Sequence, residues 1–189
     1  TTGNGIQSIG YDILPSSIDE HTTYRIKIDL KNTAQNIYAL AGNQDVSLVI
    51  PPAFHVPTPF GAHIGGVNPT FFTQEPNTQY DSWLTVGITE GNDSNLIESA
   101  GIYDITQNSI TRTPKRTINN GAVFWMIPSD GPSGDGIVIA QLTISNSETS
   151  DRTFSGLLQG KSNEGNDWQD EFFITLPPSP TPSPTPTPT

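Results

Sequence analysis

Apolar and polar residues alternate along several short segments of the chain, which is the pattern of half-buried β-strands. The clearest segment is residues 24–30, in which every second side chain is apolar: Tyr24, Ile26, Ile28 and Leu30. The side chains between them are polar or charged: Arg25, Lys27 and Asp29. This segment therefore predicts a strand with one face in a core and the other face toward solvent.

Similar apolar runs that end at turn residues predict further strands. They fall at residues 46–50, 83–88, 101–106, 109–112, 122–127, 136–144, 153–158 and 172–176. About nine or ten short strands at nearly regular spacing are typical of an all-β chain. We expect an antiparallel β-sandwich or a jelly-roll-like fold. The long stretch from 51 to 77 carries four phenylalanines among prolines and glycines, which favours an ordered loop packed against a sheet.

The end of the chain has a composition of its own, because residues 177–189 are only Pro, Ser and Thr. Frequent prolines fix φ and remove backbone donors, so an extended polyproline II tail is expected. A flexible interdomain linker is the alternative. Dense hydroxyl residues between prolines are typical of O-glycosylated stalks. The candidate acceptors are Ser179, Thr181, Ser183, Thr185, Thr187 and Thr189.

The first segment, residues 1–14, has spaced apolar side chains and no charge before Asp12. Such an arm can add as a strand to a neighbouring subunit. It can also fold back onto its own sheet. The chain is thus divided into an N-terminal arm or strand (1–14), a β-sandwich domain (15–176) and the tail (177–189).

The composition excludes several classes of binding partner and of chemistry. The chain has 19 acidic and 8 basic side chains and a net charge of −11, which opposes binding to nucleic acid or to an anionic membrane surface. It has no cysteine, so thiol chemistry and disulfides are excluded. No apolar run is long enough for a membrane helix, and no membrane insertion is expected. The first residue is Thr1 rather than Met, which indicates a processed, secreted or cell-surface chain.

Several phrases follow one another over about 120 residues and resemble a family of uncharacterised secreted β-sandwich proteins from aquatic bacteria and algae. They are residues 22–26 (TTYRI), 59–61 (PFG), 80–87 (YDSWLTVG), 121–125 (GAVFW) and 137–143 (IVIAQLT). The resemblance implies a secreted or surface sandwich, often joined to low-complexity tails, and brings no activity with it. The composition of the tail is also similar to that of glycosylated extracellular fibril subunits.

The sequence contains no catalytic or cofactor motif, so neither an enzyme nor a cofactor is expected. His55 and His63 are eight residues apart, which fits no standard metal-ligand spacing, and loop histidines that form hydrogen bonds are favoured. Paired carboxylates suitable for glycoside hydrolysis have no distinguishing motif among Asp81, Asp104, Asp170 and Glu171. Oxygen ligands for calcium occur at Glu90, Asn92, Asp93 and Asn95, but their spacing indicates a solvated turn.

Two residues suggest contact with sugars. Trp168 lies in a polar context, residues 166–171 (NDWQDE), in which an indole near water would stack on a sugar ring; packing in the core is the alternative. Trp83 and Trp125 lie in apolar runs and are expected in the core. Asn92 begins the one N-glycosylation acceptor sequence, Asn92-Asp93-Ser94, because proline blocks Asn68-Pro69-Thr70.

These features together favour a structural protein. We expect a subunit of an extracellular filament or cell-surface assembly that polymerises head to tail with copies of itself and carries a glycosylated tail. The alternative is a carbohydrate-binding module joined by its Pro/Thr linker to a larger secreted enzyme. Neither the glycans nor the source follow from the sequence.

Overall fold

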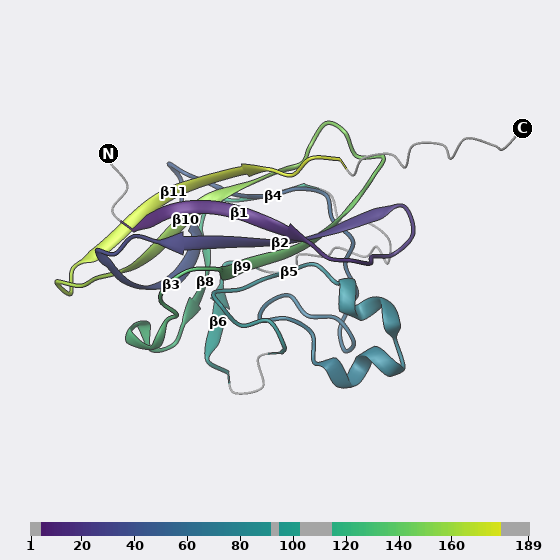
Figure 1. The fold of residues 1–189 in the computed structure, drawn as a ribbon, viewed down its shortest axis with the longest axis horizontal. Helices are drawn as coiled ribbons and strands as arrows, with labels where there is room; N and C mark the ends of the chain where they lie inside the picture. Colours follow the sequence, from purple (N-terminus) through teal and green to yellow (C-terminus); the bar gives the residue numbers. More distant parts are fainter. Residues whose placement is uncertain (1–4, 92–94, 103–114, 179–189) are drawn as a thin grey trace, which may run out of the picture.

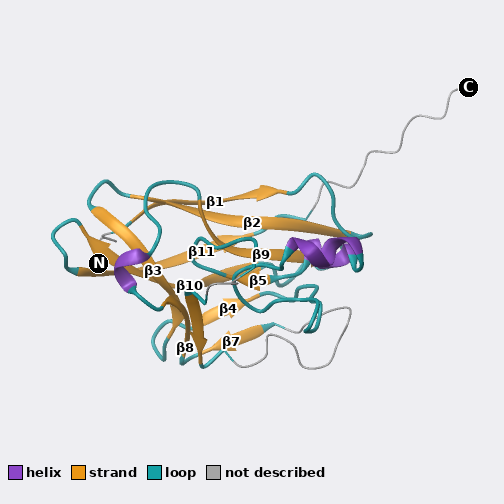
Figure 2. Cartoon of the chain, turned by 90° about the horizontal axis from the view of Figure 1, so that it is seen from below, coloured by secondary structure: helices purple, strands orange, loops and turns teal. Residues whose placement is uncertain are grey.

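The computed structural model describes residues 5–91, 95–102 and 115–178. Within these ranges the chain is an antiparallel β-sandwich of two sheets, as the strand pattern predicts (Figures 1 and 2). The strands are β1 (Ile6–Ile13), β2 (His21–Leu30), β3 (Ala34–Gly42), β4 (Leu48–Ile50), β5 (Trp83–Leu84), β6 (Ile97–Ala100), β7 (Arg116–Ile118), β8 (Gly121–Trp125), β9 (Ile137–Ser145), β10 (Thr153–Ser162) and β11 (Asp167–Thr175). Three short 3-10 helices, η1 (Pro69–Thr73), η2 (Pro76–Tyr80) and η3 (Pro128–Asp130), lie in the connections.

The first sheet has the order β1-β2-β9-β5. Its alternation follows the sequence pattern, because Tyr24, Ile26 and Ile28 of β2 are almost completely buried on one face. β1 pairs antiparallel with β2, so that Ile9 lies opposite Ile28 and Tyr11 opposite Ile26. β1 is therefore an edge strand of its own subunit.

The second sheet has the order β6-β8-β3-β10-β4-β7, with β11 paired to the other side of β10. β10 is the central strand of this sheet. It pairs with β11 along one edge and with β3 and β4 along the other. The edge strands β1 and β11 of the two sheets lie side by side along one border of the sandwich (Figure 1).

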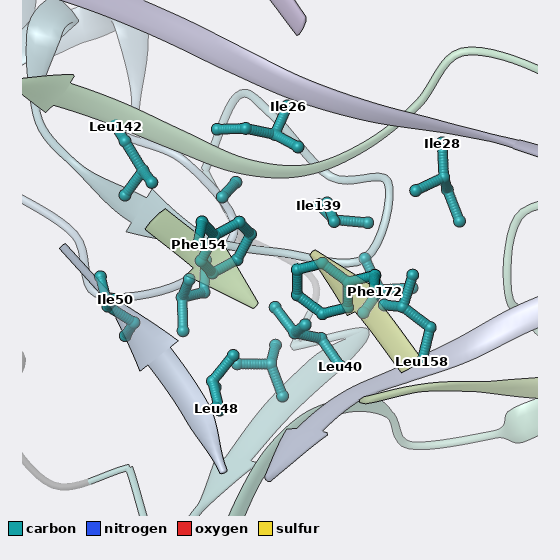
Figure 3. Packing of buried hydrophobic residues seen from close by; sticks show 14 of the residues in the cluster. Ile26, Ile28, Leu40, Leu48, Ile50, Ile139, Leu142, Phe154, Leu158 and Phe172 are labelled. Carbon is teal, nitrogen blue, oxygen red and sulfur yellow. The ribbon is translucent and has the colours of Figure 1, made fainter. Parts of the chain in front are cut away.

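The core lies between the sheets (Figure 3). Side chains of β2 and β9 from the first sheet face those of β3, β4, β10 and β11 from the second sheet. Phe154 and Phe172 meet at its centre with ring centroids 5.0 Å apart and an angle of 61° between their planes. This edge-to-face geometry is the preferred one for aromatic pairs.

The Pro-rich loop of residues 51–82 covers the outer face of the first sheet. Gln141 of β9 donates to the carbonyls of Gln79 and Asp81 at 3.0 and 2.8 Å, and the hydroxyl of Thr143 donates to the carbonyl of Tyr80 at 2.6 Å. These polar groups of β9 are fully buried beneath the loop. The expectation of an ordered loop packed against a sheet is confirmed.

The strand boundaries differ from the sequence pattern in a few places. β3, β6 and β7 are strands that the pattern does not predict. Of the N-terminal segment 1–14, residues 6–13 form β1 on the chain's own sheet, which is the second of the two alternatives. The predicted strands at 101–106 and 109–112 fall mostly or wholly outside the described residues. β3 escapes prediction because its sequence AQNIYALAG has little β-branched content, and its burial is provided by β8 and β10.

Deletion of residues 1–14 tests the place of β1. The deletion uncovers Ile26 and Ile28 and removes two amides that bond Asp170, each worth about 1.5–3 kcal/mol as a bond to a charged group. Because domains are stable by only about 5–15 kcal/mol, we expect the deleted chain to show no cooperative thermal transition by circular dichroism. A deleted chain that melts like the full chain would contradict the assignment of β1 to its own subunit.

Candidate functional site

The beginning of β1 is held to β11 by one carboxylate. Oδ2 of Asp170 accepts hydrogen bonds from the amides of Gly5 and Ile6 at 2.9 and 2.8 Å. Asp170 is buried, so these bonds are shielded from water. We call this contact the N-terminal clasp. It joins the edge strands of the two sheets and closes the sandwich at this point.

Trp168 completes the N-terminal clasp. The indole is only 3% exposed and its Nε1 donates to the carbonyl of Lys161 at 3.0 Å. A Cβ on Gly5 would lie 2.2 Å from the ring and one on Gly160 would lie 2.4 Å from it, so both positions require glycine. Trp168 therefore packs in the core, the alternative to the sugar-stacking role, and no face of its ring is open to a sugar.

The other two tryptophans, Trp83 and Trp125, differ in how deeply they are buried. Trp83 is 2% exposed and lies beneath the Pro-rich loop, so its burial is confirmed, and the guanidinium of Arg25 sits 5.9 Å from its ring. Trp125 is half-buried at the edge of the core and donates its Nε1 to the carbonyl of Val86 at 2.8 Å. Trp125 thus packs against the core, as expected, but remains partly exposed at the end of β8.

The end of β11 is held by a second contact, which we call the C-terminal clasp. Arg152 is buried and donates from Nε to the carbonyl of Leu176 at 2.7 Å and from Nη2 to the carbonyl of Pro177 at 2.9 Å. Its Nη1 donates to the carbonyls of Ser145 and Glu148. The Tyr24 hydroxyl also donates to the carbonyl of Pro177. The C-terminal clasp fixes the point at which the tail leaves the sandwich.

An exposed apolar patch lies where β8 ends. Leu96, Met126 and Ile127 form it, with 42%, 56% and 59% of their surface exposed, and Met126 donates its amide to the carbonyl of Leu96. Pro128, the next residue, accepts from the Asn36 side chain, which in turn accepts from the amide of Lys161 beside Trp168. This patch therefore lies toward the N-terminal clasp, and we call it the N-end patch.

A second exposed apolar patch lies where β1 and β11 end. Tyr11 and Ile13 are 36% and 49% exposed although they lie on the core-facing side of β1. The ring of Tyr11 is 5.5 Å from that of Tyr24, which holds Pro177, and Pro177 and Pro178 are themselves exposed. We call Tyr11, Ile13, Pro177 and Pro178 the C-end patch. It lies where β11 ends, whereas the hydrogen bonds through Pro128, Asn36 and Lys161 place the N-end patch toward the start of β11. Figure 1 shows the two ends of β11 far apart.

The predicted loop histidines meet beneath the Pro-rich loop. Nδ1 of His55 lies 2.8 Å from Oδ1 of Asp81, and the rings of His55 and His63 stack with centroids 5.0 Å apart. Asp81 also accepts from the amides of Val56 and Ala62 at 2.8 and 2.7 Å. His55 and Asp81 are 0% exposed, so this cluster ties parts of the Pro-rich loop to one another and is closed to solvent.

The motif at residues 80–87 also has a structural role. Oγ of Ser82 accepts a hydrogen bond from the amide of Thr143 at 2.9 Å. The backbone carbonyl of Ser82 lies 3.2 Å from Nδ1 of His55. Asp81, Ser82 and Trp83 are all buried. Each of these three side chains is thus occupied by attachment of the loop to β9 or by packing beneath it.

A groove of about 580 Å³ lies on the second sheet, over β3, β8 and β10. The amide side chains of Asn43, Asn120 and Gln159 line it together with small and apolar residues, among them Gly121 and Leu157. Amide groups offer both donors and acceptors, which suits hydroxyl-rich ligands.

Exposed carboxylates add electrostatic links between elements. Hydrogen bonds from the Ser8 hydroxyl and then the Gly136 amide lower the pKa of Asp29. The Lys161 ammonium, followed by the Tyr38 hydroxyl, lowers the pKa of Asp167. Their stabilisation is complete above the unfolded-state pKa of about 3.9 and is lost as the pH falls through the lowered folded-state pKa.

Several predicted positions lie outside the described residues. They are the N-glycosylation candidate Asn92, with Asp93, then Asp104, and the O-glycosylation candidates Ser179, Thr181, Ser183, Thr185, Thr187 and Thr189. In the part of the chain that the structure describes, no three His, Asp or Glu side chains gather closely enough to hold a metal ion. The same part contains no helix that is long and apolar enough to span a membrane.

Comparison of the chain with protein-family models, with curated proteins and with solved structures gives no match. The resemblance to secreted β-sandwich proteins thus stays a prediction. The arguments about function rest on the geometry of the two clasps, the two end patches and the groove.

Replacement of Trp168 by Ala tests the N-terminal clasp. Loss of a buried indole leaves a cavity and should lower the free energy of unfolding by about 3–5 kcal/mol, as for Trp83→Ala. Phe173→Ala on the same strand is the control, since that ring is 67% exposed and its loss should change stability by no more than about 0.5 kcal/mol. Urea unfolding measures both. A Trp168→Ala chain as stable as Phe173→Ala would refute the burial of the indole.

Proposed function

We propose that this chain is a structural subunit of an extracellular filament or cell-surface assembly, joined head to tail to copies of itself. The observation that carries the proposal is the pair of exposed apolar patches toward opposite ends of the sandwich, the N-end patch and the C-end patch. Contiguous exposed apolar side chains are typical of interaction surfaces. Two different patches at two ends support a heterologous contact, which repeats into an open helical fibre unless its rotation closes a ring.

Charge supports the same arrangement. The net charge of −11 makes side-by-side approach of two subunits unfavourable. The apolar side chains of the two end patches carry no charge themselves, so the contact between them adds no repulsion of its own. In this proposal the tail is an O-glycosylated coat or tether, and secretion supplies the compartment in which the glycans are added.

Charged substitutions at the two ends test the proposal. Met126→Asp and Ile13→Asp each place a carboxylate in one patch, and loss of about 1.5–3 kcal/mol of apolar burial should weaken association about 10- to 100-fold. We expect negative-stain images to show filaments for the full chain and none for either variant. Phe173→Asp changes an exposed ring of β11 that belongs to neither patch, and it should leave the filaments intact.

Mixing the two end variants separates head-to-tail contact from other arrangements. Met126→Asp retains the C-end patch and Ile13→Asp retains the N-end patch, so a mixture should form dimers that do not elongate, visible by sedimentation velocity. A full chain that stays monomeric at all concentrations would overturn the proposal. Filaments of unchanged length from both variants would do the same.

The groove on the second sheet favours a second candidate, a carbohydrate-binding module. Its amide side chains would bond sugar hydroxyls, and the small residues beside them leave room for a polysaccharide chain. In that case migration of the protein in native gels would be retarded by a soluble polysaccharide, and Gln159→Ala would abolish the retardation. Gln35→Ala, exposed on β3 outside the groove, is the matched control. Migration that no polysaccharide changes would eliminate this candidate.

A further inference from the structure

We infer that the Pro/Ser/Thr segment 179–189 of one copy binds the N-end patch of the next copy. This inference rests on the proposed head-to-tail assembly and names the partner of the N-end patch. The patch consists of Leu96, Met126 and Ile127, and the segment is a continuation of the same chain from the other end of the sandwich.

The starting point of the segment is fixed. The C-terminal clasp holds the carbonyls of Leu176 and Pro177 through Nε and Nη2 of Arg152, at 2.7 and 2.9 Å. The Tyr24 hydroxyl holds the carbonyl of Pro177 as well. Three hydrogen bonds to two successive carbonyls define where the chain leaves, which is beyond the end of β11.

The direction in which the chain leaves the sandwich decides between the two copies. Asp170 and Trp168 of the N-terminal clasp are six and eight residues from Leu176 at the C-terminal clasp, about 20–26 Å along β11, and the chain's own N-end patch lies near Trp168. Eleven residues at about 3.1 Å each would cover about 34 Å, so length alone does not separate the two copies. To reach its own patch the segment would have to reverse at once after Pro177-Pro178, and successive prolines favour extended backbone. The patch of a copy stacked end to end lies ahead of it.

The uncharged, proline-rich composition of the segment suits the apolar side chains of the N-end patch. The segment contains only Pro, Ser and Thr, so it carries no side-chain charge that a body of net charge −11 would repel. Polyproline segments bind apolar grooves with little loss of entropy, because they are already extended. Met126 adapts its shape to an irregular ligand, and the half-buried ring of Trp125 lies beside it in the chain.

The absence of cysteine from the chain allows a direct test by cross-linking. Ser183→Cys and Met126→Cys are prepared as two separate full-length variants, mixed and oxidised. If the segment of one copy lies on the patch of another, the disulfide-linked heterodimer should exceed background about tenfold, because binding raises the effective concentration of the two thiols. Phe173→Cys replaces Met126→Cys in the control, since Phe173 is even more exposed but lies outside the patch.

Three outcomes would overturn the inference. One is an equal yield of heterodimer with Phe173→Cys and with Met126→Cys. Another is rapid intramolecular closure of a chain that carries both Ser183→Cys and Met126→Cys at high dilution, which would place the segment on its own patch. A third is filament formation by a chain that ends at Pro178. In all three cases filaments of the full chain would leave the proposed function standing, whereas a monomeric full chain removes that function too.

Discussion

A single buried carboxylate determines what the N-terminal residues do. Asp170 accepts the amides of Gly5 and Ile6, 165 and 164 positions earlier in the chain, and Trp168 packs over Gly5 beside it. A buried carboxylate without such partners would be costly, so the first strand is required for the stability of β11. Because this strand is tied to its own subunit, it is not available to add to a neighbour. In the proposed assembly, contacts between copies therefore use other surfaces.

At the other end of β11 a buried charged side chain again binds the backbone, but here the side chain is the cation Arg152. Arg152 satisfies its donors with backbone carbonyls and the Tyr24 hydroxyl, and no solvent is needed. The planar guanidinium suits this role, because an ammonium offers fewer donors. The two clasps hold the strands together along the border of the sandwich, while the side chains of the two end patches remain exposed. Ends with exposed apolar side chains suit a repeating end-to-end contact.

Much of the fold follows from local pattern, and much of the site does not. The alternation at residues 24–30 identified β2 and its buried face, and the turn-bounded runs identified the sandwich. Trp168 was ambiguous because its polar neighbours in sequence are irrelevant to its burial, which comes from Gly5 and Gly160 on other strands. The same holds for Asp170 and Arg152, whose partners include residues more than a hundred positions away. The sequence does contain one sign of the N-end patch, because the apolar run of residues 122–127 continues through Met126 and Ile127 after β8 ends at Trp125.

The central claim is that each subunit closes its own border and leaves its ends for assembly. Amide hydrogen exchange at Gly5 and Ile6 tests it most directly, measured in dissociated subunits and in assembled material. The account predicts that both amides are protected in the dissociated subunit, with an opening free energy close to that of the β2 amides. Exchange at the unprotected rate in dissociated subunits, with protection only after assembly, would show that the strand is shared between neighbours and would contradict the account.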